Sequence, residues 1–269
     1  MIIDFHTHVF PNKIAAATVS ILSEKGGISP RSDGTEAGLL AALSEARADI
    51  AINLPVVTKP TQFDSVLSFA KELCDRNYVG PRIISFAGAH PDMDDVEEKL
   101  KAVKEAGILG IKLHPDYQNT FFDDPRYVRI IEAAKSLDLI VLTHAGFDFA
   151  YPGEPIRCTP VRVLRLLDKI GGYEKLVLAH MGGNALYDEV YTELAGEDVY
   201  FDTSAGLRGV GEETFKKILD KHGDRRILFA TDSPWCNIKE EVEIITGYAL
   251  GEETERRIFS DNAKRLLGI

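Results

Sequence analysis

Two histidines stand close together near the start of the chain, in the apolar segment Met-Ile-Ile-Asp-Phe-His-Thr-His-Val that covers residues 1–9. If this segment is a strand, His6 and His8 point to the same side, because side chains alternate between the two faces of a strand. Their imidazole rings can then lean together onto one small cation. The alternative interpretation is a polar strand end, with one histidine bonded to a backbone carbonyl.

Four more histidines follow apolar runs that are typical of strands: His90, His114, His144 and His180. The seventh, His222, lies in the last turn of a predicted helix, where the helix C-terminus favours a cation, and we interpret it as structural. Buried polar groups need partners. One shared cation would supply a partner for several of the strand-end histidines at once.

An aspartate ends the last of these apolar runs. Asp232 follows Ile-Leu-Phe-Ala-Thr (227–231), which is too apolar for a surface strand. A carboxylate at such a place is a metal ligand, a proton acceptor or an unpaired buried charge that costs free energy. Neutral imidazoles together with a carboxylate are ligands for zinc or a similar divalent ion. Such an ion can lower the pKa of a bound water to about 7, and a neighbouring carboxylate can accept the proton.

The segments that carry these residues alternate between strand-like and helix-like patterns. This alternation predicts parallel strands with right-handed crossovers. About eight strand-like runs in 269 residues favour an α/β fold, a (β/α)₈ TIM barrel that forms a single domain over residues 1–269. An open doubly wound sheet is the alternative, but no Gly-x-Gly-x-x-Gly follows the first strand. Beyond the opening strand, we expect strands over residues 49–54, 82–89, 109–113, 139–143, 175–179, 198–203 and 226–231.

Composition and charge exclude several partners. The formal net charge of -11 argues against nucleic acid or an anionic membrane as a partner. No run of about 18 uncharged apolar residues is present, so we expect no transmembrane helix. Three cysteines without paired spacing do not indicate a disulfide framework, and no signal peptide precedes the opening strand. We therefore expect a cytoplasmic protein that acts on a small molecule, with homo-oligomer formation left open.

Several short motifs, taken in order, resemble those of the amidohydrolase superfamily. They are His-Thr-His (6–8), Gly-Ile-Lys-Leu-His-Pro (110–115), Thr-His-Ala-Gly (143–146), Leu-Ala-His-Met-Gly-Gly (178–183) and Ala-Thr-Asp-Ser-Pro-Trp (230–235). Each motif alone is weak, but the ordered set spans nearly the whole chain. It is most similar to the amidohydrolase-related branch, which also includes aminocarboxymuconate semialdehyde decarboxylase. The resemblance implies a (β/α)₈ barrel with a single catalytic divalent ion, usually zinc.

The resemblance also implies roles for individual residues. His6, His8 and His144 would be metal ligands, and Asp232 would be a ligand or lie against the metal-bound water. His180 would be an acid or base beside the ion, or a further ligand. Asp232 and His180 are therefore the expected catalytic residues.

Other residues near strand ends are candidates for binding substrate. Lys112 shares a strand face with His114, and it could pair with an anionic substrate group or with Asp116. In two-metal members of the superfamily a carboxylated lysine bridges the ions, which is the alternative for Lys112. Arg157 and Arg208 lie in loops and could grip a carboxylate with two hydrogen bonds, or be solvated surface residues. We expect His114 to touch the substrate and Trp235 to form an apolar wall.

We predict a metal-dependent hydrolase of a small, cyclic or carboxylated substrate such as a lactone or an amide, which attacks with metal-activated water. The alternative is a metal-dependent nonoxidative decarboxylase of a small unsaturated or aromatic acid, in which His180 or Asp232 protonates the carbon. Both reactions need the same ligands, so the sequence does not separate them. A third interpretation is a metal-storing or structural barrel, but an open metal position beside an acid–base pair argues against it.

Overall fold

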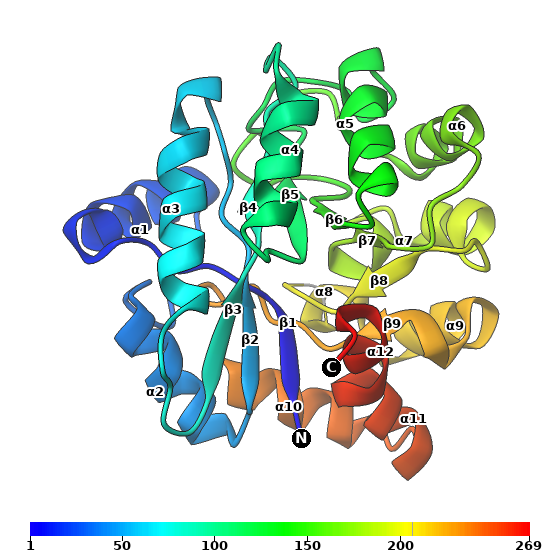
Figure 1. The fold of residues 1–269 in the computed structure, drawn as a ribbon. Coiled ribbons are helices and arrows are strands. Elements are labelled where there is room, and N and C mark those ends of the chain that lie inside the picture. Colours follow the sequence, from blue (N-terminus) through cyan, green and yellow to red (C-terminus); the bar gives the residue numbers. More distant parts are fainter. Residues whose placement is uncertain (206) are drawn as a thin grey trace.

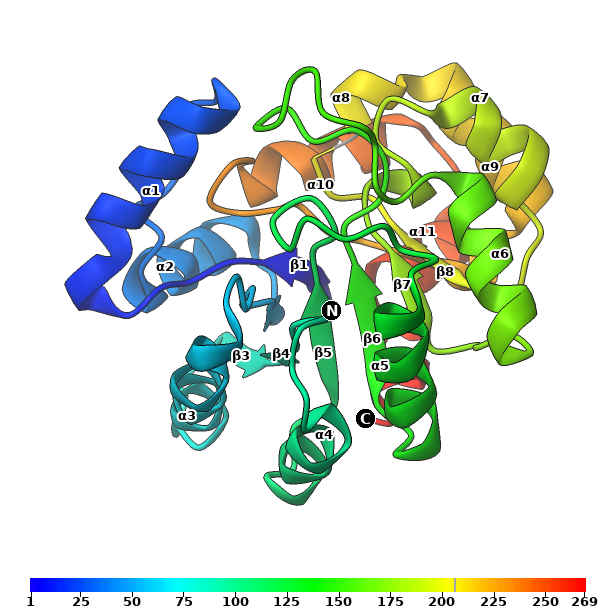
Figure 2. The same ribbon diagram turned by 90° about the horizontal axis from the view of Figure 1, so that it is seen from above.

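Parallel strands form the centre of the fold, and helices surround them on the outside (Figures 1 and 2). The structure, a computed structural model, describes residues 1–205 and 207–269. Most strands are buried on both faces, as parallel strands covered by helices are. The strands are β1 (Ile3–Thr7), β2 (Ile50–Asn53), β3 (Arg82–Ser85), β4 (Ala87–Gly88), β5 (Gly110–Leu113), β6 (Ile140–Thr143), β7 (Leu176–Leu178), β8 (Tyr200–Asp202) and β9 (Ile227–Leu228).

Helices connect successive strands, and α6 shows why such a segment is helical. Thr159 accepts a hydrogen bond from Arg162 N, Pro160 occupies the first turn, and Gly171 ends the helix in a left-handed conformation. The helices are α1 (Asn12–Gly26), α2 (Glu36–Ala46), α3 (Phe63–Cys74), α4 (Val96–Glu105), α5 (Pro125–Ser136), α6 (Pro160–Ile170), α7 (Tyr187–Glu189), α8 (Leu207–Val210), α9 (Glu212–His222), α10 (Ile238–Gly247), α11 (Glu252–Arg256) and α12 (Asn262–Leu267).

The strands pair in two parallel sheets in the described part of the chain. One has the order β1-β2-β3 and the other the order β4-β5-β6-β7-β8-β9. Only Phe86 separates β3 from β4. The opposite edges of the two sheets are β1 and β9. Between β1 and the segment that follows β9, Phe5 N donates to Phe229 O and Asp232 N donates to His6 O, each at 2.8 Å. The predicted α/β fold with parallel strands is confirmed, whereas the strand pairing itself forms two sheets and not one continuous ring.

The register of the strands brings their carboxyl ends to one edge. Leu113 pairs with Thr143 in the β5–β6 ladder, and Thr143 pairs with Leu178 in the β6–β7 ladder. The next residues along β5 and β6, His114 and His144, therefore leave the sheet side by side. This register places residues far apart in sequence at one site.

Two apolar clusters support this edge. The larger one packs the helices against the strands. The smaller one is formed by strand side chains such as Phe5, Ile52 and Leu142, and it includes Leu266 and Leu267 of α12. Removal of these side chains from water is the main force that holds the strands in place beneath the site.

The last strand is shorter than predicted. The sequence indicates a strand over 226–231, but β9 covers only Ile227–Leu228. Beyond it, Ala230 N donates to Thr203 Oγ1 at 2.9 Å, and Thr231 N donates to Asp4 Oδ1 at 3.0 Å. Buried backbone groups need partners, and here side chains supply them in place of a strand backbone. The regular ladder therefore ends before Asp232.

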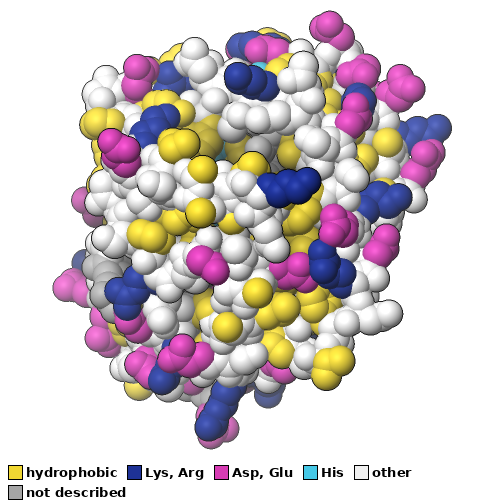
Figure 3. Space-filling model, turned by 90° about the vertical axis from the view of Figure 1, so that its left-hand side faces the viewer, with side chains coloured by type: hydrophobic (Ala, Val, Ile, Leu, Met, Phe, Trp, Pro, Cys, Tyr) yellow, Lys and Arg dark blue, Asp and Glu magenta, His cyan; other side chains and the backbone are white. Residues whose placement is uncertain are grey.

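The outer surface is mixed in charge. Figure 3 shows acidic and basic side chains interspersed on one face of the molecule, with hydrophobic side chains between them. Ion pairs such as that of Arg129 with Glu97 join neighbouring helices, here α5 and α4. Among the described residues, none of the helices combines the length and the apolar character needed to cross a bilayer.

Candidate metal centre

Three of the four expected metal ligands converge at the carboxyl edge of the strands. His6 lies in β1, His8 follows it, and Asp232 comes after β9. Candidate ligand atoms of these three residues all lie within 4.8 Å of one another. Asp232 Oδ1 is 3.0 Å from His8 Nε2 and 3.6 Å from His6 Nε2. The pairing of β1 with β2 shifts register between Asp4 and Thr7, and such irregularities re-aim side chains at functional sites.

The second nitrogen of each histidine is held by a hydrogen-bond acceptor. His6 Nδ1 is 2.8 Å from Asp202 Oδ2, and His8 Nδ1 is 2.9 Å from Leu54 O. A carboxylate and a carbonyl can only accept, so each Nδ1 carries a hydrogen, and in this tautomer Nε2 is the atom that offers a lone pair to a metal. Both Nε2 atoms lie near Asp232 Oδ1, which is itself an acceptor, and His6 Nε2 also lies 3.0 Å from Lys112 Nζ. A cation between them satisfies all three, and this set of donors fits zinc or a similar divalent ion.

Electrostatics keep the cluster in the protonation state that metal binding requires. Burial and the charge of Lys112 lower the pKa of His6 to about 3, so its ring is neutral near pH 7. Burial alone would raise the pKa of Asp202, but its interaction and hydrogen bond with His6 outweigh burial and lower that pKa. Burial is likewise outweighed at Asp232, whose pKa is lowered by its contact with His8 and by the other nearby histidines. Both carboxylates are ionised at neutral pH.

Lys112 lies against the same cluster. Its side chain is buried, and its Nζ is 3.0 Å from His6 Nε2. Burial lowers the pKa of Lys112 to about 8, so its proton is lost more easily than that of an exposed lysine. The sequence predicts that Lys112 pairs with an anionic group or, if it is carboxylated, bridges two metal ions. The structure places its amine next to a candidate metal ligand.

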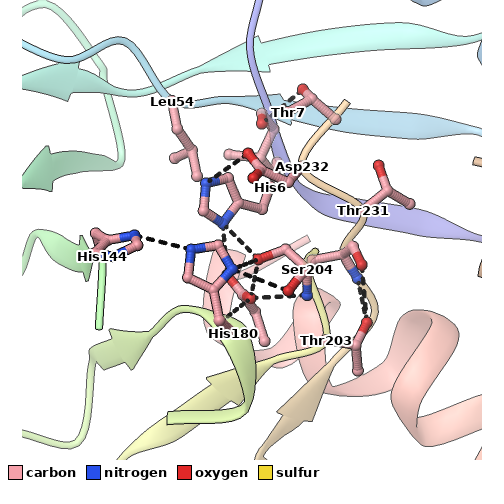
Figure 4. Close-up of polar contacts among 12 residues, drawn as sticks. His6, Thr7, Leu54, His144, His180, Thr203, Ser204, Thr231 and Asp232 are labelled. Atoms are coloured by element: carbon pink, nitrogen blue, oxygen red, sulfur yellow. Dashed lines mark hydrogen bonds and ion pairs between the residues drawn. The ribbon is translucent and has the colours of Figure 1, made fainter. Parts of the chain in front are cut away.

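His180 and His144 form a hydrogen-bonded pair beside the cluster (Figure 4). His180 Nε2 is 3.0 Å from His144 Nδ1, and His180 Nδ1 is 2.9 Å from Ser204 O. Ser204 Oγ donates to Asp202 and lies 3.0 Å from Nδ1 of both His6 and His180. Asp202 also accepts from His180 N at 2.9 Å. Asp202 and Ser204 therefore connect the candidate acid–base residue to the candidate ligand His6.

Both candidate catalytic residues have an uncommon backbone conformation. The φ angles of His180 and Asp232 are 59° and 66°, in the left-handed region that residues other than glycine rarely adopt. Such conformations cost free energy and gather at functional sites, where the surrounding structure enforces them. At Asp232 the backbone bond to His6 O holds this conformation in place.

His144, the fourth expected ligand, belongs to a second group of polar side chains. Candidate ligand atoms of His114, His144 and Asp148 lie within 4.8 Å of one another. The rings of His114 and His144 stack, with centroids 4.4 Å apart. Asp148 Oδ2 is 3.7 Å from His114 Nε2, and Asp116 Oδ2 is 3.9 Å from His144 Nε2. Within the described residues, Asp116 Oδ2, His144 Nε2 and Asp148 Oδ2 are buried and lack a hydrogen-bond partner.

Burial shifts the titration of this second group. It lowers the pKa of His114 and of His144 well below the usual range and raises the pKa of Asp148. Burial and the charge of Asp148 together raise the pKa of Asp116 to about 6. The group therefore combines neutral rings with carboxylates that bind a proton more readily than usual.

The remaining expected substrate residues have protein partners. Arg157 is buried and donates to Asp116 at 3.4 Å, to Asn119 at 2.6 Å and to Glu154 at 3.1 Å, so its guanidinium is already engaged by oxygen acceptors. Trp235 is partly buried and donates from its backbone to Asp232 O at 2.9 Å. The side chain of Arg208 lies outside the described residues.

Four polar residues of the site were not identified from the sequence as site residues: Asp116, Asp148, Asp202 and Ser204. For Asp202 a signal exists, because it ends the apolar strand Tyr200–Asp202 just as Asp232 follows an apolar run. Asp116 comes two residues after His114, but it was considered only as a partner for Lys112. Asp148 lies in an irregular loop, and no periodic pattern marks it.

Comparison with known proteins extends these observations. A search of the solved structures finds 2,6-dihydroxybenzoate decarboxylase from Rhizobium, with a TM-score of 0.72, 20% identity and coverage of 99% of this chain and 98% of that chain. A probable 2-pyrone-4,6-dicarboxylic acid hydrolase from Acinetobacter baumannii matches with a TM-score of 0.71 and 16% identity. The match covers 100% of this chain and 99% of that chain. A dihydroxybenzoic acid decarboxylase from Polaromonas sp. JS666 was solved with bound manganese and the inhibitor 2-nitroresorcinol. It matches with a TM-score of 0.71 and 18% identity, and the match covers 99% of this chain and 96% of that chain. A search of curated proteins finds no match.

These structural matches share the fold, and two of them carry decarboxylase names while one carries a hydrolase name. The family comparison is more direct. The family profile described as Amidohydrolase matches residues 3–269, a range that includes every strand and every residue of the two polar groups. The chain therefore belongs to the amidohydrolase family of metal-dependent enzymes, which act as hydrolases or decarboxylases.

Proposed function

We propose that this protein is a hydrolase that opens a small, cyclic or carboxylated lactone or amide with the help of one divalent ion. The proposal rests on a single observation: His6 Nε2 and His8 Nε2 lie 3.6 Å and 3.0 Å from Asp232 Oδ1, while Asp202 and Leu54 O accept from the far nitrogen of each ring. We further propose His144 as the fourth ligand, through Nδ1.

The residues present fit a divalent ion, and zinc suits two or three imidazoles with one carboxylate. Manganese is the alternative, since one structure of similar fold contains it. A bound ion lowers the pKa of coordinated water and polarises a substrate oxygen. We also propose that the two sheets together form a (β/α)₈ barrel and that residues 1–269 form one domain.

Asp232 and His180 supply the proton transfers in this proposal. Asp232 is ionised, and its Oδ1 faces the centre of the cluster, where it can accept a proton from water. The Nδ1–H of His180 is committed to Ser204 O, so Nε2 is the nitrogen that can take up a proton or deliver one. Two groups on different elements can thus remove a proton from water and give one to the leaving group.

A nonoxidative decarboxylase of a small unsaturated or aromatic acid is the second candidate. Its support is His180, which presents Nε2 beside the cluster and could protonate a substrate carbon as carbon dioxide leaves. Two of the structures of similar fold are named as decarboxylases of dihydroxybenzoic acids. The two candidates differ in product, since the first consumes water and the second releases carbon dioxide.

A substrate panel tests both candidates. Protein loaded with zinc or with manganese is given lactones, amides, and aromatic or unsaturated carboxylic acids, and both acid release and carbon dioxide are recorded. We expect acid release without carbon dioxide, and strongly reduced turnover by the Asp232→Asn variant. Carbon dioxide release from a carboxylic acid would establish the second candidate instead. Turnover that persists after the metal has been removed would contradict both.

A further inference from the structure

We propose that Asp116 is a positioning residue that enables His144 to bind the metal, by accepting a hydrogen that His144 carries on Nε2 only in the metal-bound state. This inference rests on the proposed function, because it takes His144 as a ligand of the proposed ion. Its starting point is a pair of atoms that face each other without a hydrogen bond. Asp116 Oδ2 and His144 Nε2 are both buried, both without partner, and 3.9 Å apart.

The hydrogen-bond network explains why these two atoms have no hydrogen bond. His180 Nδ1 donates to Ser204 O at 2.9 Å, and in this tautomer the lone pair of the ring is at Nε2. This lone pair lies 3.0 Å from His144 Nδ1, which must therefore carry the hydrogen of the His144 ring. His144 Nε2 is then an acceptor that faces the acceptor Asp116 Oδ2. Two acceptors cannot bond to each other, and both are left unpaired.

Metal binding reverses this arrangement. A nitrogen that ligates a metal needs its lone pair, so the hydrogen of His144 must leave Nδ1 and appear on Nε2. There it points at Asp116 Oδ2, and a movement of about 1 Å brings the two atoms to the usual hydrogen-bond distance. Both unpaired atoms are then satisfied. The ring gains the carboxylate partner that metal-binding histidines usually have, as His6 has in Asp202.

The surroundings of Asp116 suit this role. Its other oxygen, Oδ1, accepts from Arg157 Nη1 at 3.4 Å, while Arg157 Nη2 donates to Asn119 at 2.6 Å and to Glu154 at 3.1 Å. Arg157 thus holds one edge of the carboxylate and leaves Oδ2 directed at His144. Arg157 therefore positions the Asp116 carboxylate in this proposal and does not bind a substrate carboxylate.

The test compares the zinc affinity of two isosteric variants, measured by competition with a chelator on the full-length protein. Asp116→Asn should bind zinc about 10–100-fold more weakly than the wild type, because the amide can donate to Nε2 and stabilise the metal-free form of the ring. Asp148→Asn is the matched control: it removes the same charge from the same group, but its Oδ2 faces His114. We expect a change below threefold for the control. Circular dichroism checks that both variants fold.

A spectroscopic measurement separates positioning from a structural role. Long-range ¹H–¹⁵N NMR of the histidine rings reports which nitrogen of His144 carries the hydrogen. We expect Nδ1 in the metal-free protein and Nε2 in the zinc-loaded protein. A hydrogen that stays on Nδ1 with zinc bound overturns the inference. So does an affinity of Asp116→Asn within twofold of the wild type, or an equal loss in Asp148→Asn.

The His8→Ala variant shows which of the two proposals fails. If His8→Ala loses zinc and Asp116→Asn keeps it, the inference about Asp116 is wrong while the proposed metal cluster stands. If the wild type takes up no zinc or manganese, or if His8→Ala binds zinc as tightly as the wild type, the proposed function itself is contradicted, and with it the inference.

Discussion

The two groups of histidines and aspartates at the carboxyl edge of the strands differ in how their second nitrogens are held. In the His6–His8–Asp232 cluster, the far nitrogen of each ring already donates to Asp202 or to a backbone oxygen. In the group around His114 and His144, three buried atoms of the described residues have no partner. The first cluster is therefore organised for a cation before one binds, whereas the second still requires a hydrogen or a ligand. Neighbouring groups of histidines and aspartates can therefore differ in readiness for a metal ion. The difference lies in whether the histidine nitrogen that faces away from the ion already has a hydrogen-bond acceptor.

Removing a residue of the first cluster should have the largest effect. Asp232→Asn keeps the shape of the side chain but removes the proposed metal ligand and proton acceptor, so we expect kcat to fall by about 10³-fold. Metal content, measured by elemental analysis, should fall with it, and His8→Ala should lose the metal as well. An Asp232→Asn variant with unchanged turnover would remove Asp232 from the mechanism.

The outer hydrogen bond of the first cluster should matter next. Asp202→Asn leaves a weaker acceptor for the Nδ1–H of His6, and the expected loss of metal affinity is about 10–100-fold. The measurement is a chelator competition, with the exposed Asp64→Asn as the control. Equal metal affinities of the Asp202→Asn variant and the wild type would show that the hydrogen bond between His6 and Asp202 does not contribute to metal binding.

The sequence alone was sufficient for the parts of this comparison that depend on local pattern. Apolar runs that end in a histidine or an aspartate placed His6, His8, His144, His180 and Asp232 at strand ends, and the structure puts them at one edge of the parallel strands. The strand lengths were less predictable, since β9 stops when Thr203 and Asp4 take over its backbone donors.

The partners of these residues could not be predicted, because they depend on contacts between distant segments. Asp202 is 196 positions from His6 in the sequence, and no spacing rule links them. Asp148 sits in a loop without periodicity, and Arg157 looks like a residue for gripping substrate until its partners Asp116 and Asn119 are known. Residue type and strand position indicate a candidate ligand, while the residue that would orient it is found only in the folded chain.

Arg157 provides a smaller and more selective test of the second group. Arg157→Gln loosens Asp116, and we expect metal affinity to fall by less than about tenfold, with the KM for an anionic substrate unchanged. If Arg157 grips the substrate instead, KM should rise and metal affinity should stay constant. Measuring both quantities on the same preparation decides between the two roles.

His222, which belongs to neither group, should affect stability and leave metal binding unchanged. It is buried, accepts from Gly196 N, donates to Val199 O and stacks on Phe201. Burial lowers its pKa from an ordinary value of 6.5 to about 4. Between these values the unfolded chain binds more protons than the folded one, so stability falls as the pH drops from 6.5 to 4, by up to about 3 kcal/mol from this residue.

Urea unfolding across this pH range checks the prediction for His222. The His222→Gln variant should lose stability less steeply than the wild type between pH 6.5 and pH 4, and its zinc affinity should be unchanged. Identical slopes for the two proteins would mean that the buried ring does not titrate as described.

Crystals of the protein loaded with manganese, measured at wavelengths on either side of the metal absorption edge, test the central claim most directly. Anomalous difference density locates the ion without reference to any ligand assignment. The account predicts one strong peak within about 2.0–2.3 Å of His6 Nε2, His8 Nε2 and an oxygen of Asp232. A peak that lies only between His114 and Asp148, or no peak from fully loaded protein, would contradict it.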